Sequence, residues 1–141
     1  MAETRAPAGV VPYLTIEGAS RAIDFYRTVF GAQEAMRQMA DDGRRVLHCR
    51  LNINGGVVML SDTFPEHSGP AGPDPARASP VALSLALADP AEVDRLHGLA
   101  VEQGARSVMA PMDAVWGARF AMLTDPFGHR WLLNAERQKA G

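Results

Sequence analysis

The stretch Gly56-Val57-Val58-Met59-Leu60-Ser61-Asp62 reappears in outline 72 positions later as Gly128-His129-Arg130-Trp131-Leu132-Leu133-Asn134. In the same way, His48-Cys49-Arg50-Leu51-Asn52-Ile53 precedes Arg119-Phe120-Ala121-Met122-Leu123-Thr124 by 71 positions. Few residues are identical between the copies, but the order of the segments agrees. Self-similarity at a fixed period indicates a repeated structural unit. We therefore expect two copies of one module that build one site together.

Hydrophobic periodicity predicts a strand, a helix and three strands in each half. In the first half, the apolar stripe Ile23, Tyr26, Val29 and Phe30 predicts an amphipathic helix that ends at Gly31. The predicted strands there cover residues 10–16, 35–39, 46–53 and 57–62. In the second half, a helix that ends at Gly104 is expected to separate a strand over 83–87 from strands over 105–109, 118–124 and 129–134.

Three turn signals support these boundaries. Asn54-Gly55 between two apolar runs is typical of a hairpin. Asp89-Pro90-Ala91-Glu92 combines an N-cap acceptor, a proline at the first helical position and a glutamate that can reach back to the cap. Asp125-Pro126-Phe127-Gly128 predicts the last turn.

Composition indicates one domain over residues 1–141, with modules over about 10–62 and 81–136 and tails over 1–9 and 137–141. The linker over 63–80 contains five prolines and is expected to be irregular, as a connection or as a flap over a site. A net charge of −2 argues against a nucleic-acid partner. The sequence shows neither a secretion signal nor an apolar run long enough to span a membrane, and Cys49 is the only cysteine. These features predict a cytoplasmic protein with no membrane partner.

Several segments resemble the vicinal oxygen chelate superfamily, which includes glyoxalase I, extradiol dioxygenases and bleomycin- and fosfomycin-resistance proteins. The nearest resemblance is to its PhnB-like branch, and it covers nearly the whole chain outside the tails and the linker. The segments that carry it are Pro12-Tyr13-Leu14, Ala22-Ile23-Asp24-Phe25-Tyr26, Val29-Phe30-Gly31, Leu60-Ser61-Asp62, Trp116-Gly117-Ala118-Arg119 and Leu123-Thr124-Asp125-Pro126-Phe127-Gly128-His129-Arg130-Trp131.

The resemblance implies an α+β fold of two βαβββ modules, whose curved mixed sheet packs its helices on one face and lines a cavity with the other. Strand alternation then assigns side chains to the two faces. We expect the helix face to carry the residues Leu14, Ile16, Cys49, Leu51, Val57, Met59, Trp131 and Leu133. We expect the cavity face to carry the residues Val11, Tyr13, His48, Arg50, Leu60, Asp62, Ala82, Ser84, Arg119, Arg130, Leu132 and Asn134.

Metal-dependent relatives take ligands from the first and last strand of each module, and these places fall here at Val11, Leu60, about Ala82 and Leu132. None of these side chains coordinates a cation, so no family-type metal is expected. A polar set of side chains lies two positions further along the same strand faces. It offers a hard divalent ion one carboxylate and several neutral oxygens. Its members are Tyr13, Asp62, Ser84 and Asn134.

The expected catalytic residues are His48 and Asp62. His48 lies on a strand, and its side chain is predicted to face the cavity. It is expected to act as a general base, to contact a ligand, or to be an ordinary histidine of the cavity wall. Asp62 and Asn134 are expected to orient a ligand by hydrogen bonds or to cap strand ends. Arg50, Arg119 and Arg130 are expected to recognise an anionic or carbonyl-bearing ligand, or to lie at the rim with their stems over apolar wall. The expected ligand contacts are Tyr13, Arg50, Ser84, Trp116, Arg119 and Asn134, with Tyr13 and Trp116 as stacking aromatics or as packing residues.

Three functional hypotheses follow. The first is a dimeric PhnB-like protein that binds a small, partly apolar or aromatic anionic ligand without a cofactor, as in sequestration and resistance. The second is a lyase, isomerase or dioxygenase-like enzyme with a divergent metal site, in which a divalent cation is held weakly. The third is a non-catalytic interaction module.

Overall fold

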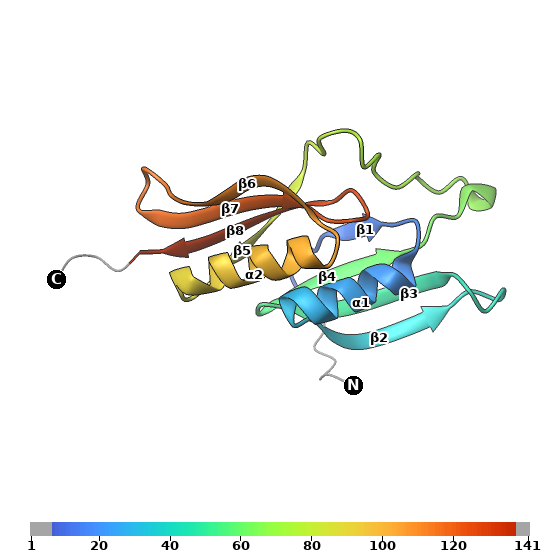
Figure 1. Cartoon of the computed structure of the whole chain (residues 1–141). Coiled ribbons are helices and arrows are strands. Elements are labelled where there is room, and N and C mark those ends of the chain that lie inside the picture. Colours follow the sequence, from blue (N-terminus) through green and yellow to red (C-terminus); the bar gives the residue numbers. More distant parts are fainter. Residues whose placement is uncertain (1–6, 138–141) are drawn as a thin grey trace. The chain divides into compact units, whose positions relative to one another are not determined.

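The computed structural model describes residues 7–137, and the chain divides near Pro73 into two compact units. We call the described part up to Pro73 module 1 and the part from Asp74 module 2. Each module is described by itself. Both pair a four-stranded mixed sheet with one helix (Figure 1). The predicted α+β fold is therefore confirmed.

Module 1 follows the predicted order of one strand, one helix and three strands. Its sheet has the order β1-β4-β3-β2, in which β1 is parallel to β4 and the other neighbours are antiparallel. The elements are β1 (Tyr13–Thr15), α1 (Ala19–Phe30), β2 (Gln33–Met39), β3 (Val46–Ile53) and β4 (Gly56–Ser61), followed by a short 3-10 helix at Pro65–His67.

Module 2 repeats this order and topology. Its sheet has the order β5-β8-β7-β6, again with one parallel pair, β5 and β8. Its elements are β5 (Ala82–Ala86), α2 (Pro90–Glu102), β6 (Arg106–Asp113), β7 (Ala118–Thr124) and β8 (Arg130–Glu136). In the part of the chain that is described, neither helix is long and apolar enough to cross a membrane.

Local turn chemistry explains several element ends. Gly31 closes α1 in the left-handed conformation, with φ of 67°. Asn54 and Gly55 also have positive φ, 49° and 80°, which is the backbone that a two-residue hairpin between β3 and β4 requires. Asp89 caps α2 by accepting a hydrogen bond from the Ala91 N–H at 2.9 Å. The expected return bond from Glu92 is wrong, because Glu92 is paired with Arg95.

The largest differences between predicted and observed strand bounds lie at β1 and β6. The strand expected over 10–16 is only the three residues of β1, and the strand expected over 105–109 extends to Asp113 as β6. Backbone pairing sets these limits, because β1 pairs with β4 over three residues whereas β6 follows β7 past two register shifts.

The two faces of each sheet are identified by contacts with its helix. The Asp62 carboxylate bonds the backbone at the start of α1, and Arg119 is paired with Asp94 of α2. Because side chains alternate along a strand, residues of the same parity share that face. Buried residues lie there, namely Leu14, Cys49, Leu51, Leu60, Ala121, Leu123, Trp131 and Leu133.

The predicted face assignment is therefore wrong for Leu60, Asp62 and Arg119, and also for Val57 and Met59. The strand pairs show why. In module 1 Tyr13 pairs with Met59, which pairs with Arg50; in module 2 the same row is Ser84, Leu132 and Met122. The true repeat offsets are thus 73 for β4 to β8 and 72 for β3 to β7, one more than expected from the sequence. A shift of one residue exchanges the two faces of a strand.

Candidate functional site

We call the sheet face opposite the helix of each module its helix-free face. The strand pairs place both polar and apolar side chains on this face in each module. In module 1 they include Tyr13, Thr15, His48, Arg50, Asn52, Val57, Met59 and Ser61. In module 2 they include Ser84, Phe120, Met122, Thr124, Arg130, Leu132 and Asn134.

Tyr13 and His48 form a pair on the helix-free face of module 1. The Tyr13 hydroxyl lies 3.1 Å from His48 Nδ1, and the two rings stack with centroids 5.6 Å apart and planes 24° apart. Tyr13 is 51% exposed, so a molecule in solution can reach the pair. A phenol hydrogen-bonded to an imidazole can donate or accept a proton, and the stacked rings offer a flat apolar surface.

Arg50 lies in the same row of the sheet as Tyr13, with Met59 between them. Its side chain is half-buried, and its Nε atom is buried without a hydrogen-bond partner. Among residues 7–137 no carboxylate is paired with it. A guanidinium that has lost water without gaining a partner is costly, so this group is suited to meet an anion.

Asp62 has a structural environment instead. One oxygen accepts hydrogen bonds from the N–H groups of Gly18 and Ala19 at 3.0 and 2.9 Å, and the other accepts from the N–H of Val46 at 2.7 Å. The side chain is buried. Its carboxylate therefore ties the start of α1 to β3 and lies on the helix face, away from His48.

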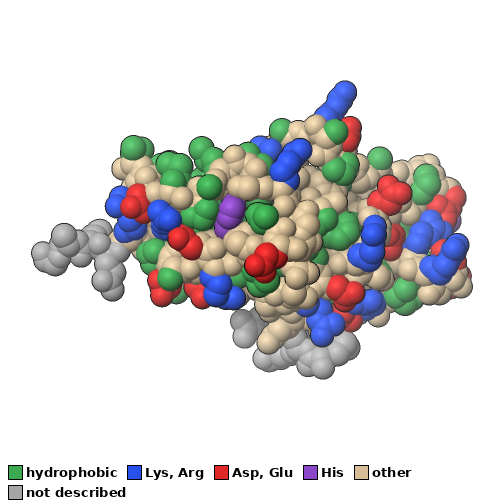
Figure 2. Space-filling model, in the orientation of Figure 1, with side chains coloured by type: hydrophobic (Ala, Val, Ile, Leu, Met, Phe, Trp, Pro, Cys, Tyr) green, Lys and Arg blue, Asp and Glu red, His purple; other side chains and the backbone are tan. Residues whose placement is uncertain are grey.

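Trp116 and Asn134 come together in module 2. The Trp116 indole N–H donates to Asn134 Oδ1 at 3.2 Å, and the Trp116 ring meets the Phe120 ring edge-on at 5.3 Å. Trp116 is 61% exposed in the turn between β6 and β7. Hydrophobic side chains gather along β6 and this turn (Figure 2). The exposed members are Val108, Met109, Met112, Val115 and Trp116.

Arg119 is placed on the helix face, where it is already paired. Its Nε and Nη2 atoms contact the two oxygens of Asp94 at 2.9 and 3.0 Å, and Nη1 contacts Asp113 at 3.2 Å. These hydrogen bonds lower the pKa of Asp94. Two carboxylates satisfy this guanidinium, so it has little left to offer a ligand.

Ser84 is exposed on β5, in the same row as Leu132 and Met122. Met122 was not among the predicted site residues, and neither was Met109, which pairs with it across β6 and β7. Methionine adapts its shape to irregular apolar ligands. The signal for these residues was the strand alternation itself, read one position out of register.

Cys49 takes no part in either helix-free face. It is fully buried, and burial raises the pKa of its thiol to about 11. The thiolate is the reactive form, so Cys49 serves as a small apolar core residue.

The sequence over residues 11–133 matches the model of the glyoxalase/bleomycin resistance protein/dioxygenase superfamily. The chain belongs to this superfamily. An uncharacterised protein of Mycobacterium bovis is 39% identical over 124 residues, which are 86% of this chain and 79% of the relative.

Solved structures of this superfamily's fold are also similar. The structure of protein PA1353 of Pseudomonas aeruginosa superposes with a TM-score of 0.74 at 27% sequence identity. The match covers 93% of this chain and 99% of that protein. The PhnB protein of Bacillus cereus has a TM-score of 0.72 at 20% identity and covers 91% and 99%. At 20% identity, the similarity to the Bacillus cereus protein shows a shared fold alone.

The superfamily's metal site does not fit the residues of this chain. With the register seen in the structure, the last-strand places are Met59 and Leu132, while Val11 precedes β1 and Ala82 begins β5. None carries an imidazole or a carboxylate, the donors that bind divalent ions. Within residues 7–137, no three His, Cys, Asp or Glu side chains lie close enough together to hold a metal ion.

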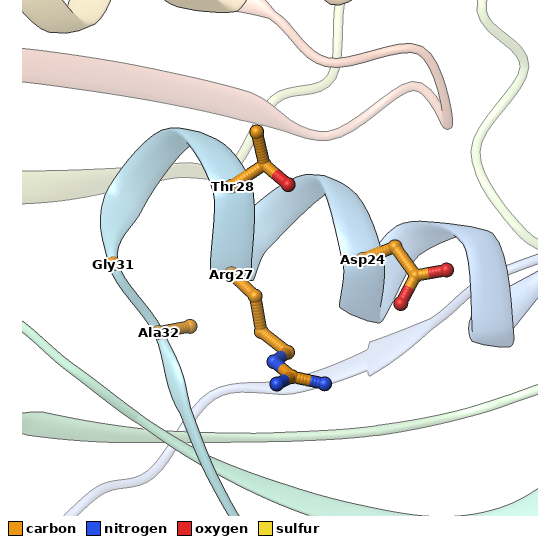
Figure 3. Close-up of a pocket in the computed structure, with 5 residues that line it drawn as sticks. All are labelled: Asp24, Arg27, Thr28, Gly31 and Ala32. Atoms are coloured by element: carbon orange, nitrogen blue, oxygen red, sulfur yellow. The ribbon is translucent and has the colours of Figure 1, made fainter.

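A separate hollow of about 430 Å³ lies beside the end of α1 (Figure 3). It is lined by Asp24, Arg27, Thr28, Gly31 and Ala32, all within module 1. Four of these five residues are exposed. The hollow contains none of the predicted site residues, and its charged groups belong to the solvent side of the helix.

Proposed function

We propose that this superfamily member binds a small, partly apolar or aromatic molecule that carries an anionic group, and that it does so without a family-type metal. One observation carries the proposal. Arg50 is a half-buried guanidinium without a carboxylate partner among residues 7–137, on a strand face whose other members in module 1 include no acid. Such a group is stabilised by an oxyanion.

Other side chains of each module support the apolar part of the ligand. In module 1, the stacked rings of Tyr13 and His48 offer a flat surface on the same sheet face as Arg50. In module 2, Trp116, Asn134 and Ser84 are the proposed contacts beside an apolar, methionine-rich face. Sequestration of a toxic small molecule is the form of binding that we favour. We further propose that the protein is cytoplasmic and forms a homodimer.

The test is a calorimetric titration of the full chain with aromatic carboxylates of increasing ring size, such as benzoate, naphthoate and quinoline carboxylates. We expect saturable binding by at least one of them, and a loss of about tenfold in affinity for Arg50→Gln, the effect of one charge-assisted hydrogen bond. Arg44→Gln is the matched control, because Arg44 is an exposed arginine of the turn before β3. Equal affinities of the two variants would refute the role of Arg50, and no binding by any acid would refute the function.

An enzymatic function is the second candidate, and the Tyr13–His48 hydrogen bond is the observation that favours it. An imidazole held by a phenol is poised for proton transfer, as a lyase or isomerase requires. If a reaction is found, we expect His48→Asn to lower kcat by about 10²-fold or more while the affinity changes little. A variant with unchanged kcat would exclude His48 as the acid or base.

A further inference from the structure

We propose that Arg106, Thr124 and Arg130 form an oxyanion-binding site on the helix-free face of module 2. These three residues are direct partners across three neighbouring strands: Arg106 of β6 pairs with Thr124 of β7, which pairs with Arg130 of β8. We call them the arginine row. Directly opposed side chains of one face lie about 5 Å apart at Cβ, so one small anion can meet all three.

Thr124 provides the first sign of a missing ligand. Its side chain is only 4% exposed, and its Oγ1 atom is buried without a hydrogen-bond partner. A buried hydroxyl that makes no hydrogen bond costs about 1–3 kcal/mol. The same position is compatible with valine in shape, so packing alone does not require a hydroxyl there.

Arg130 provides the second sign. Its side chain is half-buried, its Nε atom has no hydrogen-bond partner, and within residues 7–137 no carboxylate is paired with it. The nearest acid in the sequence, Asp125, is engaged elsewhere, since it accepts from the Trp131 indole at 2.9 Å and from two N–H groups of its own turn. Trp131 faces the helix, and Arg130 therefore faces the other way.

Arg106 adds a second positive charge at the edge of the row. The next residue, Ser107, points to the helix face, where its hydroxyl lies 2.7 Å from His97 of α2. Alternation then directs Arg106 to the helix-free face, beside Thr124. Arg106 is exposed, and no ion pair within the described chain neutralises it.

The charge balance of this face identifies the ligand class. Two guanidinium groups flank a hydroxyl that can donate, which suits a carboxylate or a phosphate group. Among the strand residues of this face that the structure describes, the only carboxylate is Glu136, at the opposite end of β8, about 20 Å from Arg130 at the usual rise per residue.

Module 1 shows that the fold does not need these charges. The corresponding row there consists of Gln33, Asn52 and Val57, which pair in the same way across β2, β3 and β4. All three are uncharged. The arginine row is therefore a feature of this sequence in module 2 and not a requirement of the repeated unit.

The inference deepens the proposed function and rests on it in one respect, because it names a second place that would hold an anionic group of the ligand. Its test uses inorganic phosphate and acetate, which carry no aromatic part. Failure of the aromatic titration and failure of the arginine row are thus separate results.

The experiment is an NMR titration of the full ¹⁵N-labelled chain with phosphate and, separately, with acetate, at constant ionic strength. We expect saturable shifts of the Thr124 and Arg130 amides, and a loss of about tenfold in affinity for Arg130→Gln. The affinity should fall by a smaller factor in Thr124→Val. Tighter binding of phosphate would indicate a phosphoryl ligand, and tighter binding of acetate a carboxylate.

Arg44→Gln is the control, and it should bind phosphate at the row like the wild type. Thr124→Val should be at least as stable as the wild type in urea, which separates the lost contact from misfolding. Shifts that do not saturate, or an Arg130→Gln variant that binds like Arg44→Gln, would overturn the proposal.

Discussion

The helix-free faces of the two modules share a backbone but differ in chemistry. In the central row, module 1 carries Tyr13, Met59 and Arg50, whereas module 2 carries Ser84, Leu132 and Met122. In module 1 the charged side chain, Arg50, therefore lies in the central row. In module 2 the charged side chains lie at the end of the sheet, in the arginine row, and the central row is uncharged. The duplication has kept the scaffold while each copy has acquired separate contacts.

The two helices differ in a second way. The N-cap residue of α1 is Gly18, which has no side chain to cap the helix, and the Asp62 carboxylate supplies the missing acceptor from 43 and 44 residues away. α2 is capped locally by Asp89. The start of α1 therefore depends on the tertiary fold, while the start of α2 is encoded beside it.

Replacement of these two aspartates tests that contrast and has the largest expected effect. Asp62→Ala removes three hydrogen bonds and leaves buried N–H groups unpaired, so we expect a loss of about 3 kcal/mol or more in the free energy of unfolding. Asp89→Ala removes one exposed cap and should cost about 1 kcal/mol. Urea unfolding of both variants measures the difference.

Asp62→Asn is the matched control, because its amide oxygen can still accept from Gly18 and Ala19 while its NH₂ group faces the Val46 N–H. Its stability should lie between those of the wild type and the alanine variant. Equal losses for Asp62→Ala and Asp89→Ala would mean that the long-range cap has no special weight.

The repeat explains why the fold was predictable. The runs that became β3 and β7 were predicted with the bounds that the structure shows, because Asn54-Gly55, Gly117 and the Asp125 turn delimit them. Such local signals act within a few residues of the chain. The end of β6 depends instead on pairing with β7, and the sequence of β6 does not contain it.

The site was predicted only in part, and the reason is again physical. Val57-Val58-Met59-Leu60 is apolar at every position, so alternation cannot decide which residues face the helix. Because β4 was assigned one residue out of register, Asp62 was predicted on the cavity face instead of the helix face. Arg119 was misassigned because its partner Asp94 lies on a helix 25 residues away, and a long-range ion pair leaves no periodic pattern.

Polar links between α2 and its sheet form a further contrast, with a smaller expected effect. α1 buries seven residues, whereas α2 buries Val93, Leu96 and Ala100 and is also joined to β7 through Asp94 and Arg119. This pair is partly exposed, so Arg119→Gln should lower the stability at neutral pH by less than Asp89→Ala does.

The pH dependence of that cost follows from the Asp94 carboxyl. Arg119 lowers the pKa of Asp94 from 3.8, so the pair's contribution is full above this value and is lost as the pH falls through the lowered pKa. Unfolding curves of Arg119→Gln and the wild type should therefore converge in strong acid. A difference that persisted there would show that Arg119 stabilises the module through packing and not through charge.

The smallest expected effect concerns His97, which links α2 to β6 through Ser107. This effect appears only on acidification. Burial lowers the pKa of His97 below its ordinary 6.5, although the nearby Asp94 opposes the shift. The folded state therefore favours the neutral imidazole, whose bond to Ser107 measures 2.7 Å. The unfolded chain takes up this proton first as the pH drops, so the stability that His97 contributes is full above 6.5 and declines below it. His97→Gln should be as stable as the wild type at pH 8 and should lose less stability between pH 7 and 5. An NMR titration in which the His97 ring changes charge above pH 6.5 would contradict this, because the attraction of Asp94 would then outweigh the effect of burial.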